Sequence, residues 1–160
     1  MEKDFTKAYI TEAFRVYARM GKPTYEQARE SIFKKELAKR ADLSPEKAIE
    51  SAERALDAQA PLLLDIEAVN ATLDLLHEGG KKEIIAAIFA VYFTDPHSPI
   101  RRGDISNRVR RFAYTSHYDE RNIYRWLKHA RLLCATLRGI RISDADERRY
   151  KTSLEIASCQ

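Results

Sequence analysis

The sequence predicts an all-α protein, a bundle of several helices. Apolar residues recur at spacings of three and four along most of the chain, whereas strand-like alternation is nearly absent. The five glycines and five prolines fall between the helical segments. With 160 residues and a hydrophobic fraction of 44%, the chain has the length and composition of one domain with an ordinary core.

The first helix is expected over residues 4–20, before a break at Gly21-Lys22-Pro23. One helical face carries its apolar residues: Phe5, Tyr9, Ala13, Phe14, Tyr17 and Met20. We interpret this largely aromatic face as core. A surface for a second copy of the chain is the alternative.

Two capping signals place the next two helices. Thr24 is followed three residues later by Gln27, the spacing of a capping box, and this helix is expected to run to about residue 40. Ser44 precedes Pro45, which makes an N-cap followed by proline at the first helical position. The third helix is expected to end before Pro61.

Gly79 and Gly80 separate the fourth and fifth helices, which are expected over residues 62–78 and 81–93. The fifth is apolar on most of its surface, which predicts a central position. We therefore expect residues 1–78 to form a supporting or oligomerising lobe.

The last two helices are expected from about residue 102 to 113 and from 119 to 138. Asp119 suits the N-cap of the second of these, and its charge suits the positive end of a helix. Gly139 suits its C-cap. These helices belong to a predicted functional unit over residues 79–142, and a polar tail, residues 143–160, follows.

Positive charge is concentrated in the C-terminal half. Residues 101–141 hold eleven Lys or Arg against three acids, a net charge of +8. Because the whole chain carries +4, the remainder carries −4. Ten of the eleven cations are arginine, whose planar fork of donors suits phosphate and the edge of guanine. This split indicates a polyanionic partner, and a solvated basic face is the alternative.

The helix over residues 119–138 divides into an apolar and a cationic face. The apolar face is predicted to be buried, with Trp126 and Leu133 at its flanks: Ile123, Leu127, Ala130, Cys134 and Leu137. The opposite face carries no acid after Glu120. The second helix of a helix-turn-helix has this character, because it packs on the first helix and also enters the major groove of DNA.

This interpretation predicts two sets of contacts with double-stranded DNA. Five side chains are expected to read bases: Arg121, Asn122, Arg125, Lys128 and His129. Six are expected to contact phosphates: Arg101, Arg102, Arg108, Arg110, Arg111 and Arg131. Ile123, Trp126 and Leu127 would hold the helix in place.

A family resemblance rests on the run Ile123-Tyr124-Arg125-Trp126-Leu127-Lys128-His129-Ala130. It resembles the second helix in the promoter-reading domain of sigma factors. It is still more similar to the phage and prophage late-gene transcription regulators of the ArpU and RinA group. The resemblance covers residues 81–139 and implies a DNA-binding regulator of mobile-element origin.

One spacing departs from the compact form of this motif. Ile105 and Ile123 are eighteen residues apart, whereas the key apolar pair of a compact unit is separated by about eleven. Either the sixth helix is long, or the turn is a loop around Ser116 and His117.

The function predicted from these features is sequence-specific binding of double-stranded DNA by a cytoplasmic transcription regulator. RNA polymerase and a second copy of the chain are the further partners that this function implies. Three alternatives remain open. They are a DNA-packaging subunit like a small terminase, a protein-interaction module that docks on the transcription machinery, and an RNA-binding protein.

Other classes of function find no support in the sequence. The two cysteines and four histidines lack metal-ligand spacing, and neither a catalytic signature nor a phosphate-binding glycine loop is present. No apolar run approaches 18 residues, and the N-terminus lacks a signal-peptide pattern. We expect no metal, no cofactor, no enzymatic activity and no membrane partner.

Overall fold

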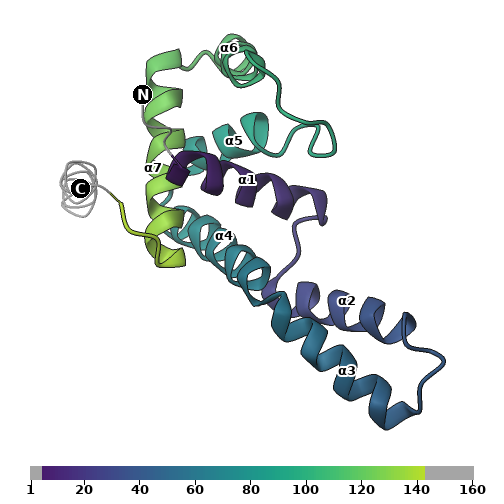
Figure 1. Ribbon diagram of the computed structural model, residues 1–160. Helices are drawn as coiled ribbons and strands as arrows, with labels where there is room; N and C mark the ends of the chain where they lie inside the picture. The colour runs from purple at the N-terminus through teal and green to yellow at the C-terminus, as the bar shows by residue number, and fades with distance from the viewer. Residues whose placement is uncertain (1–4, 143–160) are drawn as a thin grey trace.

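A computed structural model describes residues 5–142, and this part of the chain is all-helical, as the sequence predicts (Figure 1). The predicted tail, residues 143–160, lies outside the described residues. The described residues form seven helices: α1 Phe5–Arg19, α2 Tyr25–Ala38, α3 Pro45–Ala58, α4 Ala60–Glu78, α5 Lys82–Val91, α6 Asp104–Ser116 and α7 Glu120–Arg138.

The local start signals act as expected, with differences at Ser44 and Pro61. Ser44 occupies the N-cap position of α3, but its side chain forms no capping hydrogen bond. The Gln27 amide donates to Thr24 Oγ1 at 3.2 Å, and the Thr24 amide donates to Gln27 Oε1 at 3.0 Å, which completes the capping box of α2. Pro61, however, lies in the first turn of α4 and does not precede that helix. Proline is tolerated there because the first amides of a helix have no intrahelical acceptor.

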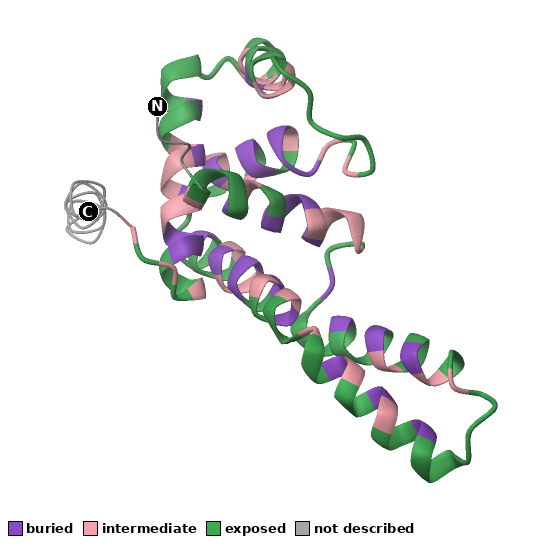
Figure 2. Ribbon diagram, in the orientation of Figure 1, coloured by how far each residue is buried: buried purple, intermediate pink, exposed green. Residues whose placement is uncertain are grey.

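One hydrophobic core joins α1, α4, α5, α6 and α7 and extends to Ala28 and Ile32 of α2 and Leu56 of α3. α4 packs most extensively on α7, and α1 contacts both of them. The core includes Phe14 of α1, Val69 of α4, Ile88 of α5 and Leu127 of α7, all of them buried (Figure 2). The boundary expected between residues 78 and 79 therefore does not separate two cores.

The part that stands apart from this body is the hairpin of α2 and α3 (Figure 1). Outside the pair, these helices contact only α4. Three small residues, Ala28, Ala48 and Ala52, are buried along the hairpin together with the larger Ile32 and Leu56. Its surface charges pair locally, for example Lys34 with Glu30 at 2.8 Å.

The apolar faces of α1 and α7 are buried only in part. Phe14 and Tyr17 belong to the core, but Phe5 is 76% exposed, so its expected core position is wrong. Tyr9 is also exposed, and its hydroxyl donates to Asp65 Oδ1 at 2.8 Å. Leu137, expected in the buried stripe, is 41% exposed, although its neighbour Arg138 donates to Asp65 of α4 at 2.7 Å, so its expected core position is wrong.

A buried arginine of α1 shapes the connection between α5 and α6. Arg15 is 1% exposed and donates to the carbonyl oxygens of four loop residues: Tyr92 at 3.1 Å, Thr94 at 2.8 Å, Asp95 at 2.8 Å and Ser98 at 2.5 Å. Burial, followed by the neighbouring Arg108 guanidinium, lowers the pKa of Arg15. Arg15 thereby fixes the segment that leads into α6.

Candidate nucleic-acid interface

The connection between α6 and α7 is a short turn. α6 has 13 residues and ends at Ser116, and the C-cap residue His117 adopts the left-handed conformation with φ 64°. Only residues 117–119 separate it from α7. Of the two explanations for the wide spacing of Ile105 and Ile123, the long sixth helix is therefore the one observed. Figure 1 shows α6 end-on and α7 along its length, so the two axes cross at a large angle.

Aromatic packing fixes this turn against both helices. The Tyr118 ring lies 5.9 Å from the Phe112 ring of α6 and meets the Trp126 ring of α7 edge-on at 5.0 Å, measured between centroids. Val109 and Ile123, both fully buried, lie in the core between the two helices and the body. The orientation of α7 relative to α6 is thus set by packed side chains on both sides of the turn.

Asp119 caps α7 as the sequence predicts. Its Oδ1 accepts a hydrogen bond from the Arg121 amide at 2.8 Å. We expect Asp119→Ala to lower the free energy of unfolding by about 1 kcal/mol, because the first amides of α7 lose this acceptor. Urea denaturation followed by circular dichroism measures the change. Asp119→Asn keeps an acceptor, and an equal loss in that variant would show that the cap is not responsible.

The residues expected to read bases differ in exposure. Arg121, Asn122 and Arg125 are exposed on the N-terminal half of α7 (Figure 2). Lys128 and His129 are half-buried. Burial, followed by the nearby Lys81 ammonium, lowers the pKa of His129, so the ring is neutral at pH 7. The structure therefore brings the first three residues together on an open surface and sets the last two deeper.

Four of the residues expected on phosphates are also exposed: Arg101, Arg102, Arg110 and Arg111. Arg101 and Arg102 precede α6, and the other two lie on it. Together with Arg121 and Arg125 they make six arginines, here called the basic surface. Within residues 5–142, no side chain of the basic surface forms an ion pair or a hydrogen bond. Its positive charge is therefore not neutralised by the described part of the protein.

The other two residues expected on phosphates have partners inside the protein. Arg108 Nη1 donates to the Val91 carbonyl oxygen at 2.8 Å, and Arg131 Nη1 donates to the Tyr92 hydroxyl at 2.7 Å. Carbonyls at the C-terminal end of a helix carry partial negative charge and attract cations. Arg108 and Arg131 thus fasten α6 and α7 to the end of α5, and we leave them out of the basic surface.

Tyr114 of α6 is a surface residue that the sequence did not single out. It is 84% exposed and lies three and four residues after Arg111 and Arg110, so it shares their side of the helix. A tyrosine hydroxyl is a common donor to phosphate oxygen. An aromatic residue in an otherwise polar stretch was the available signal.

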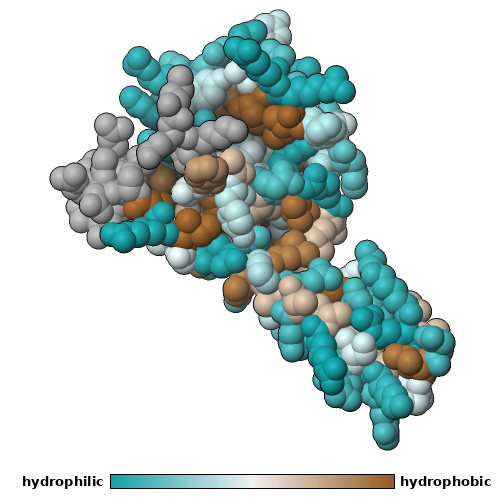
Figure 3. Space-filling model, in the orientation of Figure 1, coloured by the Kyte–Doolittle hydropathy of each residue, from teal (hydrophilic) through white to brown (hydrophobic). Residues whose placement is uncertain are grey.

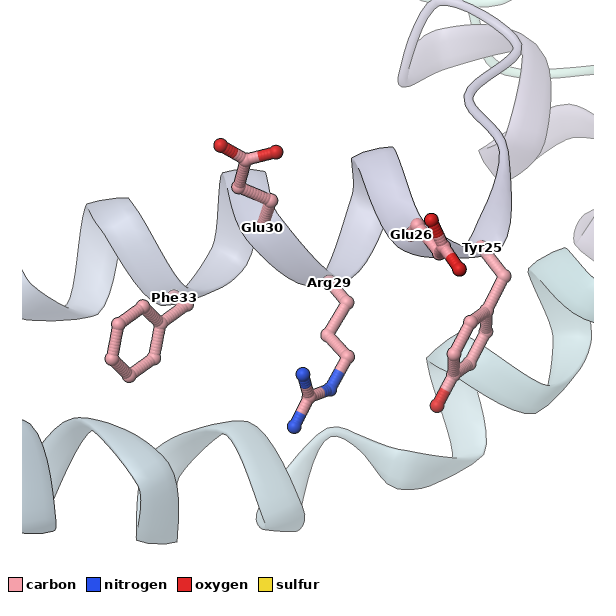
Figure 4. A pocket seen from close by; sticks show the side chains of 5 residues that line it. All are labelled: Tyr25, Glu26, Arg29, Glu30 and Phe33. Atoms are coloured by element: carbon pink, nitrogen blue, oxygen red, sulfur yellow. The ribbon is translucent and has the colours of Figure 1, made fainter.

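A groove lies along α2 (Figure 4), which is on the hairpin that stands apart from α6 and α7 (Figure 1). Its volume is about 580 Å³, and Tyr25, Arg29 and Phe33 point to one side of the helix, away from Glu30. All its lining residues belong to α2, so it is an open helix flank and not an enclosed site.

A metal site, a reactive cysteine and a membrane-spanning helix each require features that residues 5–142 lack. No group of three or more His, Cys, Asp or Glu side chains in residues 5–142 is placed to hold a metal ion. Burial raises the pKa of the Cys134 thiol to about 11, so Cys134 is not a nucleophile at neutral pH. Among the described helices, none combines the length and apolar character that crossing a membrane requires.

Comparison with known protein families, with characterised proteins and with solved structures finds no match to this chain. The interpretation of the basic surface therefore rests on its own geometry and charge.

Proposed function

We propose that the chain binds double-stranded DNA through the basic surface of α6 and α7 and regulates transcription. The observation that carries this proposal is the set of six exposed arginines that lack partners in the described part of the protein. An arginine that is unpaired on a protein surface keeps all its donors available for an anion.

The geometry of the two helices supports this proposal. In a helix-turn-helix, the N-terminal residues of the second helix contact base edges while the first helix crosses the DNA backbone. Arg121 and Arg125 lie in the first two turns of α7, and Arg110 and Arg111 lie on α6. A turn of three residues joins the helices. The positive end of the α7 dipole adds to the attraction for phosphate.

The resemblance to the ArpU and RinA group extends the proposal from DNA binding to a biological role. It favours a cytoplasmic regulator of phage or mobile-element origin that acts on DNA beside RNA polymerase. A second copy of the chain would place two basic surfaces on paired half-sites about 34 Å apart. The exposed hairpin of α2 and α3 leaves room for contacts with such partners away from the DNA.

Binding to mixed-sequence duplex DNA, measured by fluorescence anisotropy at several salt concentrations, tests the proposal. Contact of Arg101, Arg102, Arg110 and Arg111 with about four phosphates would give a slope near −4 for the logarithm of the binding constant against the logarithm of salt concentration. Undetectable binding at low salt would overturn the DNA proposal, and equal affinity for duplex RNA would reassign it.

Two alanine variants separate base reading from phosphate contact. Arg125→Ala is expected to relax the preference for one base position by about 1–3 kcal/mol. Arg110→Ala is expected to weaken binding evenly across sequences and to reduce the salt slope by about one unit. A selection from random duplexes, followed by titrations, measures both effects. If the two variants behaved alike, the division of roles between α6 and α7 would be wrong.

A further inference from the structure

A hollow of about 480 Å³ lies between α1, the start of α6 and α7. Its lining comes from these three helices, from Tyr92 at the end of α5 and from Ile100 of the following loop. In Figure 3, apolar side chains gather on the surface between α6 and α1 and are framed by hydrophilic ones. Binding sites for small molecules are commonly concave spaces of this size between helices.

Hydrogen-bond donors without acceptors lie on one side of the hollow. Arg131 uses Nη1 for the Tyr92 hydroxyl at 2.7 Å, whereas its Nε and Nη2 have no partner within residues 5–142. Tyr92 is 2% exposed, and its hydroxyl accepts this bond without donating its own proton to any described residue. A planar guanidinium and a phenolic O–H that both lack an acceptor fit the two oxygens of a carboxylate.

The charge around these donors also favours an anion. Glu12, the acidic lining residue, is paired with Arg19. An anion near Arg131 therefore meets no uncompensated carboxylate of the protein in the lining.

The remaining walls are apolar. Ile105 of α6, Leu127 of α7 and Ala8 of α1 line the hollow beside the ring of Tyr124. Such walls suit an aromatic or branched aliphatic body, whose transfer from water is favourable in proportion to its buried area. A doubly charged phosphate would lose more hydration than this apolar hollow compensates.

We propose that this hollow binds a small monocarboxylate with an aromatic or branched aliphatic body. The carboxylate accepts from Arg131 and from the Tyr92 hydroxyl, and the body lies against Ile105 and Leu127. The site is independent of the proposed DNA contacts, because no residue of the basic surface lines the hollow.

Isothermal titration calorimetry at pH 7 tests this site with phenylacetate, 3-phenylpropanoate and 4-methylpentanoate, each beside its neutral amide. At least one carboxylate should bind saturably. Its amide should bind at least about tenfold more weakly, because the charge-assisted hydrogen bonds are lost. Tyr92→Phe removes only the hydroxyl and should weaken the carboxylate about tenfold.

A second variant tests the location without removing any donor. Ala8→Trp should fill the hollow and abolish binding, whereas Ala86→Trp, at an exposed position of α5 outside the lining, should not change it. Thermal melts confirm that each variant is folded. The proposal is overturned if no carboxylate binds at millimolar concentration, if the amides bind equally well, or if Tyr92→Phe and Ala8→Trp leave binding unchanged.

Discussion

Replacement of Arg15 by methionine is expected to lower the free energy of unfolding by about 3–5 kcal/mol. The guanidinium supplies four hydrogen bonds to carbonyls of residues 92–98, and each bond from a charged donor contributes about 1.5–3 kcal/mol. Relief of the buried charge offsets part of this loss, and three of the four carbonyls belong to half-buried or exposed residues that water can reach. Because small domains are stable by about 5–15 kcal/mol, the effect is large.

Urea denaturation measures this loss, and Arg19→Met is the matched control on the same helix. Arg19 pairs with the exposed Glu12 on the surface, and a pair of that kind contributes about 0–1 kcal/mol. Arg15→Lys keeps the charge but lacks the fork, so an intermediate loss is expected. A change below about 1 kcal/mol in Arg15→Met would mean that the α5–α6 connection holds its shape without Arg15.

The helices could be predicted because their ends are coded locally. Thr24 with Gln27 and Asp119 accept hydrogen bonds from amides within three residues, and Pro45 occupies the first turn of α3, so each of these signals can be recognised in the sequence. Pro61 misled the prediction because proline marks both the residues after a helix and the first turn of the next one. With only Gln59 between α3 and α4, those two positions coincide.

Arg15 could not be predicted, because its partners are 77–83 residues away in the chain. The spacing of residues along a helix does not distinguish an arginine at the edge of the apolar face from an arginine whose side chain enters the core. Phe5 shows the reverse case. It continues the aromatic spacing of α1 but lies in the first turn, where no helix of the described body covers it.

The basic surface could be predicted as a region but not residue by residue. A charge count places Arg108 with Arg110, and Arg131 with Arg125. The structure separates them because Arg108 and Arg131 face the end of α5, whereas Arg110 and Arg125 are exposed. Their acceptors, a helix-terminal carbonyl and a buried tyrosine, become neighbours only when the chain folds.

Reversal of two charges on α7, Arg121→Glu with Arg125→Glu, is expected to weaken DNA binding at least about 100-fold. Two base contacts of about 1–3 kcal/mol each would be lost, and two carboxylates would then face the phosphates. Fluorescence anisotropy with duplex DNA at fixed salt measures the change. The matched control is Arg29→Glu with Lys47→Glu, since both residues are exposed on the hairpin of α2 and α3 and the net charge changes equally.

The comparison of these two double variants distinguishes DNA binding at a defined site from a general effect of the net charge. If net charge alone attracted DNA, both variants would lose affinity to the same extent, and the proposed interface would be wrong. The α7 variant is expected to remain folded, because both replaced side chains are exposed and form no ion pair or hydrogen bond within residues 5–142. Arg121 is in the first turn of α7, where a glutamate is favoured by the helix dipole by about 0.3–1 kcal/mol. A folded protein that no longer binds DNA would therefore locate the contact at the N-terminal half of α7.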